Sequence, residues 1–274
     1  MKQAYGFTEF ESIAEFKTWL AKQKVYRKVT RLQVHHMWMP DYSCWSKDNA
    51  LRRQKNTKDY HIHTNHWDDI AQHFSIMPNG HIVTGRSLNK TPIGIRGWNT
   101  NAICCEIYGN FDSGHDKMTT AQKEAVIALY GELCKKFKIP VNSTHIRPHA
   151  WFTAGGTYLG DYSPSRSAKS CPGTNFMGIG NTKKAFVKFY SMIKEYMNGK
   201  KEEPKVEKPT SKYTTGVYKV DTDDLNVREK ATADSEKVGV VHKGDAYTIT
   251  KVDGNWGYLK SGLGWINLKY CKKV

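Results

Sequence analysis

The chain has 274 residues, more than one ordinary domain of about 100–200 residues and fewer than three, so we expect two domains. It carries 42 Lys and Arg against 26 Asp and Glu, a formal net charge of +16, which points to a polyanionic partner such as nucleic acid, an anionic membrane surface or an anionic wall polymer. Hydrophobic residues at 39% exclude a chain disordered throughout, and no apolar run reaches the roughly 18 residues of a membrane-spanning helix.

Hydrophobic spacing predicts helices and strands that alternate along the first 199 residues. Helices are predicted over 10–23, over 119–137 and over 182–197. Strands are predicted over 29–34 with His35 and His36 at the end, over 73–77 and 81–84 as a hairpin, over 102–108, and over a short segment that reaches His145. This alternation predicts an α/β (α+β) domain with a central mixed β-sheet flanked by helices.

The sharpest break in composition lies at 199–212, GKKEEPKVEKPTSK, where alternating charges and two prolines disfavour a packed element. We therefore predict a linker between a domain over 1–198 and a domain over 213–274. Residues 1–199 hold 27 Lys and Arg against 15 Asp and Glu, so +12 of the charge belongs to the larger domain. Short β runs separated by Gly-rich turns fill 213–274 and predict a small all-β barrel.

Most of the eleven histidines fall in the larger domain, and two residues there stand out as candidate metal ligands. His35 closes a hydrophobic strand, where a rigid element can hold a ligand. Cys171 stands in Ser-Cys-Pro-Gly, where a Pro-Gly turn fixes its backbone. Two imidazoles and one thiolate would make a three-ligand zinc site with an open fourth position, which is the catalytic pattern. For any single histidine, an ordinary surface or polar-network role is the alternative.

Six motifs follow one another within residues 25–180: LQVHH, HFSIMPNGHIVTGR, NTNAICCEIYGN, TTAQKEAVIALYGELCKKFKI, STHIR and KSCPGTNF. In order and character they resemble the zinc-dependent N-acetylmuramoyl-L-alanine amidases of the peptidoglycan-recognition and phage-lysozyme type. The resemblance implies that His35, His145 and Cys171 bind Zn²⁺. It also implies hydrolysis of the amide between N-acetylmuramic acid and L-alanine in bacterial peptidoglycan.

The same resemblance implies two catalytic roles. Glu106 matches the Glu of the family's Ile-Gly-Ile-Glu strand motif, the general base and acid, and Lys169 matches the cation that stabilises the oxyanion. Some relatives have a Tyr where Gln72 stands, and a glutamine cannot transfer a proton, which leaves that work to Glu106. By strand alternation His36 points to the opposite face from His35.

Two features depart from the family pattern. The segment between His145 and Cys171 is long, and His149 is a rival for the second ligand, although His145 is favoured because it ends the predicted strand. Residues 42–67 have no clear counterpart, and we interpret them as a specificity loop over the groove. Trp45 and Trp67 there either stack on sugars or cover the edge of the core.

The small domain carries LNVR, GVVHKG, GNWGYLK and GWI in sequence. In order and spacing these resemble the bacterial SH3-type wall-binding module. Trp256 and Trp265 are candidate wall-binding residues, with a place in the core as the alternative for both. A flexible linker would raise the effective concentration of the catalytic domain at the wall.

We therefore expect a phage or prophage endolysin, a wall-lysing amidase whose partner is peptidoglycan, with anionic wall polymers as a further partner. The amino terminus lacks the apolar stretch of a secretory signal, so we expect synthesis in the host cytoplasm and release through a holin-type pore. The alternatives are a host autolysin or germination amidase, a non-catalytic peptidoglycan-recognition protein, and a peptidase with Cys171 as nucleophile. Nucleic-acid binding ranks below these, because no matching motif is present.

Overall fold

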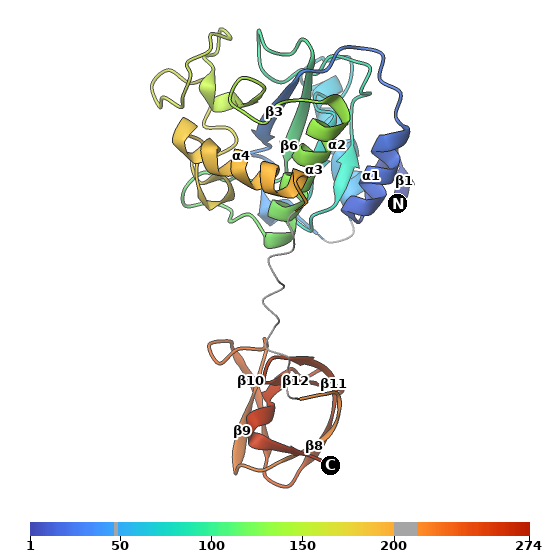
Figure 1. Ribbon diagram of the computed structural model, residues 1–274, viewed down its shortest axis with the longest axis vertical. Helices are drawn as coiled ribbons and strands as arrows, with labels where there is room; N and C mark the ends of the chain where they lie inside the picture. Colours follow the sequence, from blue (N-terminus) through green and yellow to red (C-terminus); the bar gives the residue numbers. More distant parts are fainter. Residues whose placement is uncertain (47–48, 200–212) are drawn as a thin grey trace. The chain divides into compact units, whose positions relative to one another are not determined.

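The computed structural model describes residues 1–46, 49–199 and 213–274, which form two compact units, Met1–Lys200 and Lys201–Val274 (Figure 1). The predicted linker, 199–212, lies outside the described residues except for its first position. Each unit has its own sheet and its own apolar core, and each is described by itself.

A seven-stranded mixed sheet forms the centre of the first unit. In spatial order its strands are β1 (Lys2–Ala4), β2 (Phe7–Phe10), β5 (Ile82–Thr84), β4 (Phe74–Ile76), β6 (Ala102–Ile107), β3 (Arg31–His36) and β7 (Ile146–Pro148). The last four of these run parallel to one another, and the remaining pairs are antiparallel. The carboxyl ends of four parallel strands therefore meet at one edge, the usual place for a ligand site in such sheets.

Three helices begin at hydroxyl caps. They are α1 (Ile13–Lys22), α3 (Thr120–Phe137) and α4 (Lys183–Met197), and Figure 1 shows α3 and α4 lying together across the sheet. The side chains of Ser12, Thr119 and Thr182 each accept a hydrogen bond from the backbone N–H three residues further on. No helix in the described ranges is long and apolar enough to cross a membrane.

Strand alternation sorts side chains to the two faces of the sheet. Leu32 and Val34 of β3 join the large core that contains the apolar residues of α1, α3 and α4. Gln33 and His35, which alternate with them, point to the other face, where Ala50 of α2 (Ala50–His63) belongs to a smaller apolar cluster with Tyr108. His35 therefore lies on the α2 face, and the prediction of a mixed sheet flanked by helices is confirmed.

The expectation of a loop over 42–67 is wrong, because α2 occupies most of that segment. Its buried residues are Ala50 and Gln54, so it lacks the apolar stripe by which a helix is identified from sequence. The strand pair β1 and β2 at the amino terminus was also missed. These strands have only three and four residues, too few to show a period.

The second unit is a seven-stranded sheet in which every pairing is antiparallel. In spatial order its strands are β10 (Lys237–His242), β9 (Asp224–Arg228), β13 (Trp265–Asn267), β12 (Trp256–Leu259), β11 (Ala246–Asp253), β8 (Gly216–Val220) and β14 (Cys271–Lys273). The predicted all-β domain is confirmed. The last strand, β14, shows no apolar β run, because two of its three residues are lysines.

Candidate active site

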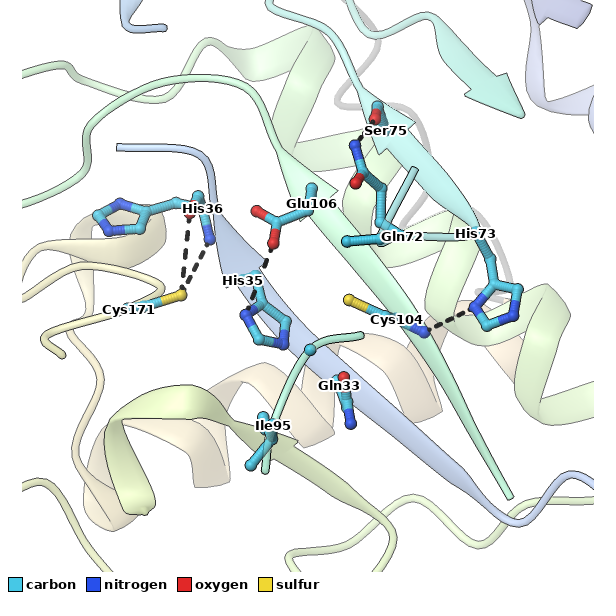
Figure 2. Close-up of polar contacts among 12 residues, drawn as sticks. Gln33, His35, His36, Gln72, His73, Ser75, Ile95, Cys104, Glu106 and Cys171 are labelled. Atoms are coloured by element: carbon cyan, nitrogen blue, oxygen red, sulfur yellow. Dashed lines mark hydrogen bonds and ion pairs between the residues drawn. The ribbon is translucent and has the colours of Figure 1, made fainter. Parts of the chain in front are cut away.

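Three polar side chains stand side by side on the α2 face of the sheet. His35 of β3 is the register partner of Glu106 of β6, and Glu106 is the register partner of Ser75 of β4. Register partners in a parallel pair point to the same face, and adjacent strands lie about 4.8 Å apart. Nδ1 of His35 lies 3.6 Å from Oε1 of Glu106 (Figure 2). Parallel pairing thus brings groups from three distant parts of the sequence into one row.

The imidazole of His35 also belongs to a cluster with His149 and Cys171, whose ligand atoms all lie within 4.8 Å of one another. His149 directly follows Pro148, which is the register partner of Val34, and His35 directly follows Val34. The two histidines therefore stand side by side at the carboxyl ends of adjacent parallel strands. Their ring centroids are 5.1 Å apart. The backbone N–H of His36 donates to Sγ of Cys171 over 3.3 Å, which holds the thiol beside the end of β3.

These three residues fit a metal ion. Nε2 of His35 is buried and has no hydrogen-bond partner in the part of the chain that is described. Burial lowers the pKa of His149 to about 4 and that of His35 well below its usual value, so both rings are neutral, which is the form that binds a metal. Two imidazole nitrogens and one sulfur suit zinc and leave a fourth position for a substrate atom.

The choice of His145 as second ligand needs correction, because the structure brings His149 and not His145 to the cluster. The strand β7 begins at Ile146, one residue after His145, and ends at Pro148. His145 therefore stands before the strand, at the end away from His35, and its Nδ1 lies 2.9 Å from Oδ1 of Asn142. The prediction failed because it ended the strand three residues too early.

The loop that carries Cys171 is fixed on both sides. The backbone carbonyl oxygen of Cys171 accepts a hydrogen bond from the N–H of Ala150 over 2.7 Å. Oδ2 of Asp112 accepts from the hydroxyl of Ser170 over 2.9 Å. Gly173 adopts φ +112°, and a Cβ there would lie 2.3 Å from the carbonyl oxygen of Phe111, so only glycine permits this close approach.

Glu106 and Lys169 border the same cavity as the cluster. The side chain of Glu106 is 19% exposed, and burial raises its pKa to about 8, while the positive charge of Lys169 opposes that rise. Oε2 of Glu106 is buried without a hydrogen-bond partner among the described residues. A carboxyl group with such a pKa can accept and return a proton near neutral pH.

The cavity has a volume of about 1230 Å³ and receives one face of α2. Arg53, Asn56 and Tyr60, spaced three and four residues apart, lie on that face. The two tryptophans of the segment have different surroundings. Trp67 lines the cavity, whereas the ring of Trp45 packs on Tyr108 with centroids 5.3 Å apart, at the edge of the core.

His36 and Gln72 also take distinct places. Nδ1 of His36 accepts a hydrogen bond from the N–H of Phe111 over 3.1 Å, and its ring lies against that of Phe111, although His36 also borders the cavity. Gln72 is fully buried, and it borders the cavity beside Glu106. The polar face of α2 was not among the site residues expected from the sequence. The signal was present as polar side chains at helical spacing from Arg53 onwards.

The second unit separates its two candidate tryptophans. Trp256 lines a groove of about 300 Å³ together with Arg228 and Tyr270. Trp265 is absent from that lining in the described part of the unit, and it packs on Tyr258 with ring centroids 5.1 Å apart. The structure thus gives a surface groove to one tryptophan and a cross-strand packing role to the other.

The sequence matches a family model described as N-acetylmuramoyl-L-alanine amidase over residues 25–174 and a bacterial SH3 domain model over residues 223–271. Peptidoglycan-recognition protein 2 of Holotrichia diomphalia is 32% identical over 80 residues, which are 29% of this chain and 42% of that protein. The chain therefore spans less than half the length of this curated relative.

The solved structures that are similar to parts of the chain include a peptidoglycan-recognition protein and an endolysin. Drosophila peptidoglycan-recognition protein LB shares 19% identity at a TM-score of 0.45, over 62% of this chain and 84% of that one. The endolysin N-acetylmuramoyl-L-alanine amidase LysCS of Clostridium intestinale shares 25% identity at a TM-score of 0.37, over 54% of this chain and 78% of that one.

Proposed function

Because the chain belongs to the N-acetylmuramoyl-L-alanine amidase family, we propose that it hydrolyses the amide between N-acetylmuramic acid and L-alanine of peptidoglycan, with Zn²⁺ held by His35, His149 and Cys171. One observation carries the proposal. A cluster that fits zinc, a carboxyl group of raised pKa and a lysine border one cavity. This combination suits metal-assisted hydrolysis of an amide.

Zinc, when bound, would supply Lewis-acid polarisation at this end of the cavity. Glu106 takes a proton from the attacking water, whose oxygen bonds to the lactyl carbonyl carbon. The ammonium of Lys169, which borders the cavity, stabilises the negative charge that develops on the carbonyl oxygen. Glu106 then gives its proton to the alanine nitrogen, the C–N bond breaks, and the muramyl glycan separates from the stem peptide.

The biological role that we propose is lysis of the bacterial wall as a phage or prophage endolysin. The pairing of an amidase region with a bacterial SH3 domain supports it, because the second unit would hold the first at its polymeric substrate. The net charge of +16 would favour a wall rich in anionic polymers. In this proposal the protein is made in the host cytoplasm and reaches the wall through a holin-type pore.

We expect the groove around Trp256 to bind the wall. Replacing Trp256 by alanine should weaken binding of the full chain to purified walls about tenfold, because it removes the largest aromatic surface of the groove. Cosedimentation with walls measures this effect. Trp265→Ala is the matched control and should bind within about twofold of the wild type at equal folded fraction. Equal loss of binding in both variants would count against the groove.

Digestion of purified walls, with mass-spectrometric identification of the new ends, tests the proposed reaction. We expect free L-alanine amino termini and no new reducing sugars. New reducing ends without L-alanine termini would mean that a glycosidic bond is cut. Binding to walls without any new ends would indicate a peptidoglycan-recognition protein that does not cleave.

A further inference from the structure

Gln72 is a buried polar residue for which the proposed reaction has so far given no role. Its side chain is fully buried, and it borders the cavity that Glu106 and Lys169 also border. Within the described ranges, its Oε1 has no hydrogen-bond partner. Burying an amide oxygen without a partner is unfavourable, because its hydrogen bond to water is lost and not replaced. The cavity is therefore where this oxygen would find a donor.

The strand register fixes where this carboxamide lies. Nε2 of Gln72 donates to Oγ of Ser75 over 3.0 Å, and Ser75 is the register partner of Glu106. Because β6 lies between β4 and β3, Glu106 has Ser75 on one side and His35 on the other. Figure 2 shows Glu106 between the His35 and Cys171 side chains and the Gln72 and Ser75 side chains.

The order of groups across the sheet suggests a ligand for the free oxygen. An amide oxygen accepts hydrogen bonds only, so its partner must carry N–H or O–H. Building on the proposed function, we propose that Oε1 of Gln72 accepts the hydrogen of the scissile amide nitrogen. The carbonyl oxygen of that amide points to the His35–His149–Cys171 cluster. The amide nitrogen lies beside Glu106, on the side of Gln72.

This contact would position the leaving group. The nitrogen keeps its own hydrogen, which is hydrogen-bonded to Oε1 of Gln72, while it receives a second proton from Glu106. The C–N bond then breaks to give a primary amine. Ser75 holds the carboxamide through its nitrogen, so orienting the oxygen costs little at the moment of reaction. Gln72 thus selects amides over esters, which lack the hydrogen.

The test uses the zinc-loaded full chain and two synthetic muropeptides, the natural amide and an ester in which L-lactate replaces L-alanine. We expect Gln72→Leu to lower kcat/KM for the amide about tenfold to a hundredfold. For the ester, kcat/KM should change less than about twofold, because no N–H is lost. Zinc content should stay at the wild-type value.

Gln54→Leu is the matched control. Gln54 is also fully buried, its Nε2 donates to the carbonyl oxygen of Thr84 over 2.8 Å, and it has an unpartnered Oε1 among the described residues, but it does not border the cavity. Gln54→Leu should change kcat/KM by the same factor for the amide and for the ester. An equal fall of amide and ester hydrolysis in Gln72→Leu, or no fall in either, would overturn the inference. A wild-type protein that splits neither substrate would instead defeat the proposed function, and this inference with it.

Discussion

Replacing His149 by alanine should abolish stoichiometric zinc binding and with it hydrolysis, whereas replacing His145 by alanine should leave both unchanged. His149 lies with His35 and Cys171 in a cluster whose ligand atoms are within 4.8 Å of one another. Loss of a residue that only supports a ligand costs about 10–100-fold in metal affinity, so loss of a ligand should cost more than about a hundredfold. Competition with a chromophoric chelator measures this affinity.

The pair of variants separates ligation from folding. His145 is partly exposed, stands before β7 and has its Nδ1 2.9 Å from Oδ1 of Asn142. Its replacement therefore tests whether losing any histidine near β7 disturbs the fold enough to release zinc. Circular dichroism should show the same folded fraction for both variants. Zinc lost from His145→Ala and kept by His149→Ala would contradict the assignment and restore the ligand expected from the sequence.

Glu106→Gln should lower kcat about 10²–10⁴-fold while zinc remains bound at one equivalent. The amide keeps the shape and hydrogen-bonding reach of the carboxyl, but it can neither accept nor return a proton. Because Glu106 lies 3.6 Å from His35 and is not among the clustered ligand atoms, its neutral replacement should not release the metal. Release of L-alanine amino termini measures kcat, and atomic absorption measures zinc.

Cys171→Ser serves as the contrast to Glu106→Gln. It should lose both metal and activity, because a hydroxyl replaces the sulfur ligand. Both variants should then be inactive, but Glu106→Gln should keep its zinc and Cys171→Ser should lose it. Full activity in Glu106→Gln would refute its role as base, and full activity with zinc in Cys171→Ser would refute the ligand set.

A helix or strand was predictable from the sequence wherever its hydrophobic periodicity and its flanking residues indicate the same element. The helix α3 has Thr119 as a cap and an apolar face, Leu32 and Val34 alternate with polar residues in β3, and β6 is apolar except for Glu106, so their positions follow from the sequence. The helix α2 was not predictable in this way, because it faces the cavity with Arg53, Asn56 and Tyr60. A helix that lines a cavity carries polar residues on the face where a helix packed on the core would carry apolar ones.

The site was predictable in its residue types but not in its membership. His35 and Cys171 each had a local signal, a strand end and a Pro-Gly turn. The choice between His145 and His149 depended on where β7 ends, and that end is fixed by pairing with β3 through Pro148 and Val34. Pairing between residues over a hundred positions apart leaves no local trace, so only the folded chain places His149 beside His35.

An anomalous difference map, recorded at the zinc absorption edge from crystals of the zinc-loaded protein, would locate the metal directly. We expect one strong peak in contact with Nε2 of His35, a ring nitrogen of His149 and Sγ of Cys171, at about 2.0–2.1 Å from nitrogen and about 2.3 Å from sulfur. A peak bound to His145, or a map with no peak between His35 and Cys171, would contradict this ligand set.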